Sequence, residues 1–267
     1  MGGFNSMIAK QKKEAGGALV ATVLLDKQSV VIHDRLPLED VPPMTEKEYF
    51  TLGCTALLDA VGGAIHHIGN IHKYARREDV PEKTMFIITT DGYENASRRY
   101  DYETVRRMIQ RQKEKYGWEF LFLGANIDAA KEAARFGIGA DRSVNYKCDE
   151  AGTALNYEVI SEAVCSVRAA RPLSADWKRR IDEAVRLHEP DVVDDLLLAR
   201  GTGAKGQRGG VERPVCVLRG DEELPYQVHV ALHDAPPKLK EVPRRRAQFR
   251  RLPILCLRPS TLPSTIV

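Results

Sequence analysis

The sequence predicts an α/β fold, a doubly wound and mostly parallel sheet with helices on both faces. Residues 85–88 form a continuous apolar run (MFII) that two threonines follow, a pattern typical of a strand buried on both faces. Segments of this kind alternate with amphipathic helical patterns at the spacing of βαβ units. With 267 residues, of which 43% are hydrophobic and 29% charged, the chain can bury a substantial core.

The part of the chain before this strand contains one helix, a hairpin and a second helix. Phe4, Met7 and Ile8 recur at helical spacing, and Gly16-Gly17 ends the first helix. Two apolar segments joined by a short turn then predict an antiparallel hairpin, with strands at residues 18–25 and 29–33. The second helix is expected over about 55–75. Its Gly62-Gly63 pair lowers helix propensity, which suggests close packing against the sheet at that point.

After the strand, helices and strands continue to alternate. Asp101 is the expected N-cap of a helix over residues 102–116, and Asp128 that of a helix over 129–136, which Gly137 ends. The remaining predicted elements are strands at 119–123 and 143–146, a helix that Thr153 opens, and a last helical segment at 177–187.

The composition changes near residue 189. Residues 1–188 are expected to form the folded domain, and residues 189–267, rich in Pro, Gly and Arg, a largely irregular or disordered tail. A short helix at 192–198 and isolated strands at 215–218 and 227–232 are the only elements expected there. The arginine run at 244–251 could attract polyanions. A solvated tail, or sequence joined by a frameshift or junction error, explains it more simply.

Charge and cysteine usage restrict the class of protein. The formal net charge of +3 does not indicate nucleic-acid or membrane binding by the whole chain. The five cysteines are widely spaced without a CxxC pair, which argues against a disulfide framework or a zinc site and for a reducing compartment. No stretch has the roughly 18 apolar residues of a membrane span, and the first residues lack the apolar region of a secretory signal. We therefore expect a soluble cytoplasmic protein.

Two polar positions stand out at the predicted sheet. Asp91 directly follows the buried strand, and the carboxyl ends of strands are where open α/β sheets bind ligands. Taken alone, Asp91-Gly92 fits a simple turn better. Thr55 precedes the second helix and could be its N-cap or a ligand. Asp59, one turn into the same helix, is either a solvated charge in the first turn or a residue that lies behind a ligand site formed by Thr55 and Asp91.

Several segments resemble the von Willebrand factor type A family. The resemblance rests on TALLDAVG (55–62) and FIITTDGYEN (86–95), with further similarity to bacterial, cytoplasmic-looking members in GAIHHIGNIHKYA, YGWEFLFLGANIDA and VNYKCDEAGTALNYEVISEAVCSVR. It covers roughly residues 2–185. It implies a doubly wound sheet with a metal-ion-dependent adhesion site at its edge. In the family, three loops build this site: an Asp-x-Ser-x-Ser motif, a threonine and an aspartate.

By this resemblance, Thr55 is the threonine ligand and Asp91 the aspartate ligand, with Asp59, Gly92 and Glu94 at the rim or behind the ligands. The implied function is a protein-interaction module that binds a partner's Glu or Asp carboxylate through Mg²⁺, which prefers about six oxygen ligands. No bond is made or broken, so an enzyme is not expected.

The sequence departs from the family pattern because it has no Asp-x-Ser-x-Ser motif. It begins where the family's first helix is already under way, so the first strand, which is central in the family's sheet, is expected to be absent. The metal site is then incomplete, with weak or no Mg²⁺ binding, and the sheet has a gap unless another segment fills it. A truncated gene product is the corresponding expectation. The alternatives are polyanion or nucleic-acid binding through the basic tail, and a non-functional fragment.

Other side chains suggest chemistry less strongly. The spacing of His66, His67 and His72 does not place the imidazoles on one helical face, so surface or packing roles are expected. Cys54 has no evident neighbouring base and is interpreted as a small buried residue. No nucleophile with a matching base can be defended from the sequence.

Overall fold

The computed structural model describes residues 1–25, 29–47, 55–187 and 226–233. Within these ranges the strands form one sheet in the order β2-β1-β6-β3-β4-β5. The strands are β1 (Ala18–Leu25), β2 (Val30–Pro37), β3 (Lys83–Thr90), β4 (Glu119–Gly124), β5 (Ser143–Asn145) and β6 (Tyr226–His233). The α-helices are α1 (Gly2–Gln11), α2 (Leu57–Tyr74), α3 (Tyr102–Tyr116), α4 (Ala129–Arg135), α5 (Glu150–Arg168) and α6 (Arg179–Arg186).

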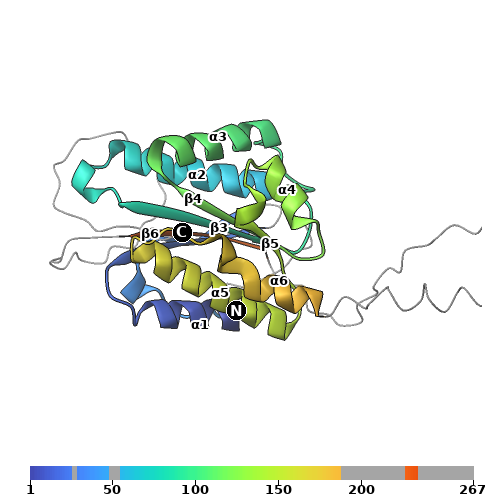
Figure 1. The fold of residues 1–267 in the computed structure, drawn as a ribbon. Coiled ribbons are helices and arrows are strands. Elements are labelled where there is room, and N and C mark those ends of the chain that lie inside the picture. The colour runs from blue at the N-terminus through green and yellow to red at the C-terminus, as the bar shows by residue number, and fades with distance from the viewer. Residues whose placement is uncertain (26–28, 48–54, 188–225, 234–267) are drawn as a thin grey trace, which may run out of the picture.

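The helices cover both faces of the sheet (Figure 1). Helices α2, α3 and α4 lie on one face, and α1, α5 and α6 lie on the other. Strand β3 shows how alternate side chains serve the two cores. Phe86 and Ile88 join the core beneath α2 and α3, whereas Met85 and Ile87 join the core beneath α1 and α5. The α/β class predicted from the sequence is confirmed.

Strand directions divide the sheet into a parallel and an antiparallel part. β3, β4 and β5 pair in parallel, and β1 and β2 form the predicted antiparallel hairpin. β6 lies antiparallel to both β1 and β3, so β1 points in the same direction as β3. Four of the described strands therefore run one way, and their carboxyl ends meet at one edge.

The bounds of most elements agree with the sequence pattern. β1 and α3 span the predicted residues, and the Asp101 carboxylate accepts a hydrogen bond from the Thr104 N–H at 2.7 Å. Helix α5 begins earlier than predicted because Asp149, whose carboxylate accepts from the Gly152 N–H at 2.6 Å, is its N-cap rather than Thr153. A local hydrogen bond thus sets the start of α5.

The segment predicted as an isolated strand at 227–232 is instead a central strand of the sheet. β6 pairs with β1 over residues 226–233 and with β3 over residues 227–233. β1 is buried along its whole length, and β3 from Thr84 onward, so the backbone groups on the edges that face each other need a partner. A segment from the predicted tail thus lies in the middle of the sheet, between β1 and β3. The other elements expected in that tail, at 192–198 and 215–218, lie outside the described residues.

Helices α1 and α5 are joined by one buried arginine. The Arg168 guanidinium donates to the carbonyl and side-chain oxygens of Gln11 at 2.7 and 2.9 Å. It also donates to the carbonyls of Glu14, Ala15 and Gly16 at 3.3, 3.2 and 2.7 Å. Gln11 in turn donates to Ser161 of α5. Arg168 thus binds the last residue of α1 and the three carbonyls of residues 14–16 that follow the helix.

None of the helices in the described ranges combines the length and the apolar character that a membrane-spanning segment needs.

Candidate functional site

The candidate site lies at the edge where β3 ends and α2 begins. Asp91 directly follows β3, and the loop from residue 91 to 100 returns over the N-terminus of α2. Two hydrogen bonds join this loop to Thr55. The Thr55 N–H donates to Asn95 Oδ1 at 2.8 Å, and the Asn95 N–H donates to the Thr55 carbonyl at 3.0 Å. Thr55 is therefore fixed to the loop that starts at Asp91.

Glu94 caps α2 from a distance in sequence. One carboxylate oxygen accepts from the Leu58 N–H at 2.8 Å and from the Ser97 hydroxyl at 2.7 Å. The other oxygen accepts from the N–H groups of Ala96 and Ser97 at 2.9 and 2.7 Å. A carboxylate at this position also complements the positive end of the helix dipole. Glu94, predicted at the rim, thus holds the loop on the helix.

Asp59 holds the far end of the same loop. Its carboxylate accepts hydrogen bonds from the N–H groups of Arg98, Arg99 and Tyr100 at 2.8 to 3.0 Å. Partial burial acts to raise the pKa of Asp59, but the three N–H donors and the Arg99 charge outweigh it, so the pKa is below its usual value. Of the two roles considered for Asp59, a position close behind the site fits its contacts better than a solvated charge.

The Thr55 side chain does not cap α2. The helix starts at Leu57, after Ala56, and has no side-chain cap of its own. The N-cap interpretation of Thr55 is therefore wrong, because Glu94 takes that role. Thr55 is only 1% exposed, and its Oγ1 has no hydrogen-bond partner within the described part of the chain. A buried hydroxyl left in this state costs roughly 1–3 kcal/mol, and it marks a place where a ligand atom would be favourable.

Asp91 is partly buried at the end of β3. Burial is the main cause that raises the pKa of the Cys148 thiol to about 11, and the charges of Asp91 and Asp149 add to it. Asp91 is thus close enough to the start of α5 to act on Cys148. Gly92 continues the turn, and its carbonyl accepts a hydrogen bond from the Thr90 hydroxyl at 2.8 Å.

The sequence analysis missed Ser97. Its hydroxyl accepts a hydrogen bond from the Asp59 backbone N–H at 2.9 Å and donates to the Glu94 carboxylate, so it joins the first turn of α2 to Glu94. No sequence pattern could have shown this, because Ser97 and Asp59 are 38 residues apart. Within the described ranges, no three His, Cys, Asp or Glu side chains gather into a metal-binding group.

The three histidines of α2 have separate environments. His67 Nε2 is 3.0 Å from Asp34 Oδ1, and His66 is exposed. The His72 ring makes an edge contact with Trp118, and burial, aided by the Arg35 charge, lowers the pKa of His72 to about 4. They form no common site, in agreement with the packing and surface roles expected for them.

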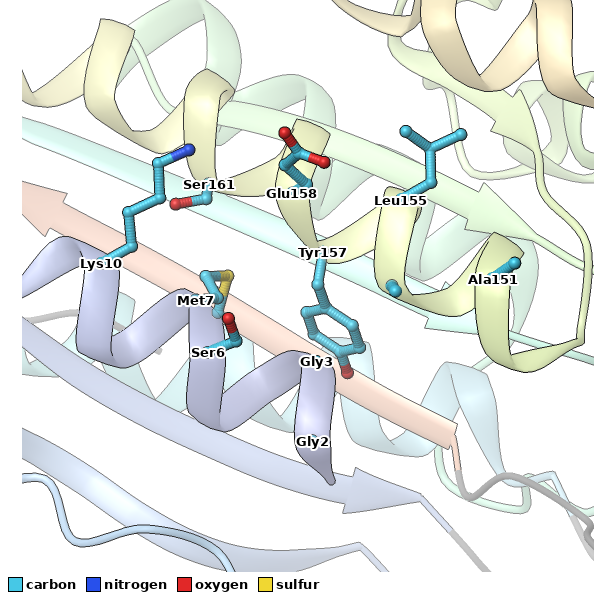
Figure 2. Close-up of a pocket in the computed structure, with 11 residues that line it drawn as sticks. Gly2, Gly3, Ser6, Met7, Lys10, Ala151, Leu155, Tyr157, Glu158 and Ser161 are labelled. Carbon is cyan, nitrogen blue, oxygen red and sulfur yellow. The ribbon is translucent and has the colours of Figure 1, made fainter.

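A groove between α1 and α5 contains none of the predicted site residues. Its volume is about 490 Å³, and Ser6 and Lys10 of α1 and Leu155 and Glu158 of α5 line it. Figure 2 shows the Tyr157 ring projecting from α5 toward Gly3, where a Cβ would lie 2.3 Å from Tyr157 Cδ2. The two helices therefore touch at that end and enclose a shallow hollow beyond it.

Comparison with protein-family models, with curated proteins and with solved structures found no match to this chain. Its function therefore has to be argued from the site itself. Cys54 and the arginine run at 244–251, which carries the polyanion alternative, both lie outside the described residues.

Proposed function

We propose that this chain is a protein-interaction module of the von Willebrand factor type A kind. It binds a carboxylate of a partner protein through a divalent metal ion at the sheet edge formed by Thr55 and Asp91. The observation that supports this best is the buried Thr55 hydroxyl, which lacks a hydrogen-bond partner in the described part of the chain. Hydroxyl and carboxylate oxygens are ligands that Mg²⁺ accepts, so the residues present fit the ion in part.

The ligand set is incomplete in this chain. Thr55 and Asp91 supply two of the roughly six oxygens that Mg²⁺ prefers, and water would supply the others. Weak binding is the consequence, with a Kd of roughly 1 mM or above, as in the weakest protein sites for divalent cations. An ion with few protein carboxylates remains under-neutralised, which is what allows it to attract a partner's acidic side chain.

Titration of the full chain with Mg²⁺ tests the proposal, with calorimetry and the shift in Tm as readouts. Thr55→Val and Asp91→Ala are expected to abolish the Mg²⁺-dependent rise in Tm, whereas Asp141→Asn, a change at a surface carboxylate before β5, should preserve it. In EDTA, Thr55→Val should leave Tm unchanged or raise it, because valine replaces an unsatisfied hydroxyl with an isosteric methyl group. A wild-type chain that shows no response to Mg²⁺ at tens of millimolar would contradict the proposal.

A further inference from the structure

A cavity of about 590 Å³ lies between α2 and the hairpin strands β1 and β2. Its floor is apolar and is formed by side chains of both β1 and α2. Ala21 and Val23 belong to β1, and Ala60, Ala64 and Ile68 belong to α2. All five are buried. The volume is within the range of small-molecule sites, which are mostly apolar with a few polar groups at the opening.

The two glycines of α2 at residues 62 and 63 have different surroundings. A Cβ on Gly62 would lie 2.6 Å from the Tyr100 ring, so close packing requires glycine there, against Tyr100 rather than against the sheet as predicted. A Cβ on Gly63 would meet no atom within 4 Å, and Gly63 lines the cavity. Glycine inside a helix costs about 1 kcal/mol relative to alanine. Since packing does not require glycine at this position, its effect is to keep the cavity open.

Of the charged side chains at the rim of the cavity, the Asp34 carboxylate has two hydrogen-bond donors, whereas the Arg99 guanidinium has no acidic partner within hydrogen-bond distance in the described part of the chain. The Asp34 carboxylate accepts hydrogen bonds from His67 Nε2 at 3.0 Å and from Arg35 Nε at 3.2 Å. Arg99 also lines the cavity, and it forms no ion pair within the described part of the chain. Its guanidinium lies 5.7 Å from the centre of the Tyr100 ring. The neighbouring acid, Asp59, already accepts three backbone N–H groups. The Arg99 charge helps to lower the pKa of Asp59, but the Arg99 guanidinium has no carboxylate partner within hydrogen-bond distance among the described residues. Its N–H groups are therefore available to a ligand at the mouth of the apolar cavity.

We propose that this cavity is a binding site for a small organic molecule with an apolar body and one anionic group. The body packs against the alanines and Ile68, and the anionic group pairs with the Arg99 guanidinium, which suits carboxylate or sulfonate geometry. This site involves neither Thr55 nor Asp91, so it is independent of the proposed metal-dependent function.

Two fluorescent probes that differ in charge test the proposal on the full chain. The anionic probe is 8-anilinonaphthalene-1-sulfonate, and the neutral probe is N-phenyl-1-naphthylamine. Gly63→Leu, which fills the cavity, should weaken binding of both probes at least tenfold. Gly69→Ala is the matched control, since it makes the same helix more favourable without lining the cavity, and it should bind both probes as the wild type does.

A second variant tests whether Arg99 pairs with the anionic group. Arg99→Gln should weaken the sulfonate probe about threefold to tenfold and leave the neutral probe unchanged. Equal weakening of the two probes would contradict the pairing with Arg99. Failure of both probes to bind the wild type, or unchanged binding by Gly63→Leu, would overturn the site itself.

Discussion

Arg168 satisfies five backbone and side-chain oxygens at the junction of α1 and α5. A guanidinium can be buried at low cost only when its N–H groups are paired in this way. Its acceptors are the last residue of α1 and the carbonyls of residues 14–16 that follow it. One side chain therefore attaches the end of α1 and the segment after it to α5.

We predict that Arg168→Met lowers the free energy of unfolding by about 2–4 kcal/mol, because the two buried oxygens of Gln11 and the partly buried carbonyls of residues 14–16 lose a donor at once. Urea denaturation measures the change. Arg171→Met is the matched control, since Arg171 is exposed, and it should change stability by less than about 0.5 kcal/mol. Equal free energies of unfolding for the two variants would show that the hydrogen bonds of Arg168 do not stabilise the fold.

The sequence could not reveal this role of Arg168. Its acceptor Gln11 is 157 residues away, and the helical pattern of α5 only places an arginine near the end of the helix. Asp101 and Asp128, by contrast, were predicted as N-caps from the sequence alone. The prediction is confirmed, since each carboxylate accepts a hydrogen bond from the N–H three residues later. Local hydrogen bonds were predicted at these two helices but not at α5, where Asp149 is the N-cap and not Thr153. Roles set by tertiary contacts, such as that of Arg168, could not be predicted.

At the scale of elements, the loop over residues 91–100 and the N-terminus of α2 form one unit. Glu94, Asn95 and Ser97 bind the first residues of the helix, and Asp59 of the helix binds the end of the loop. The sequence placed Thr55, Asp59 and Glu94 near one edge. It could not assign the cap of α2 to Glu94, because the N–H group that donates to Glu94 belongs to Leu58, 36 residues away.

This unit predicts a pH dependence. The pKa of Asp59 is lower in the folded chain than in the unfolded chain. The contribution of the Asp59 carboxylate to the stability of the fold is therefore fully present above the unfolded pKa of about 3.9. It is lost as the pH falls through the lower pKa of the folded chain. Asp59→Asn should therefore reduce stability by about 1–2 kcal/mol at pH 7, a value limited by solvent exposure.

The difference from the wild type should shrink as the pH falls below about 4. Urea denaturation at several pH values measures it. Asp141→Asn serves as control, because Asp141 makes only an exposed ion pair with Arg142. A stability difference for Asp59→Asn that stays constant from pH 7 to pH 3 would contradict the assignment.

At the scale of the whole molecule, the sheet depends on a strand from beyond residue 187. The sequence predicted that a central strand was absent, and β6 occupies the place between β1 and β3. The orientation of β6, antiparallel to both neighbours, could not be predicted. The apolar pattern at 227–232 indicated a strand, but no local signal states which strands it joins.

Val230→Pro tests this arrangement. Val230 pairs with Ala21 on one side and with Phe86 on the other. Proline removes a backbone donor and is poorly tolerated in a central strand, so the free energy of unfolding should fall by about 3 kcal/mol or more. Hydrogen exchange should show faster exchange of amides in β1 and β3.

Val215→Pro is the control, because it makes the same substitution outside the described sheet, and it should leave exchange in β1 and β3 unchanged. If Val230→Pro had the exchange pattern of the wild type, residues 226–233 would not lie between these strands in solution.

The position of β6 also sets the order in which the protein can fold during synthesis. Thr90, the end of β3, and His233, the end of β6, are separated by 143 positions, which a ribosome adding 5–20 residues per second needs roughly 7–30 s to translate. For that interval the nascent chain exposes two apolar strands with unpaired edges, the kind of surface that aggregates or recruits chaperones. We therefore expect slower translation between residues 90 and 233 to lengthen the time during which these edges are open to aggregation.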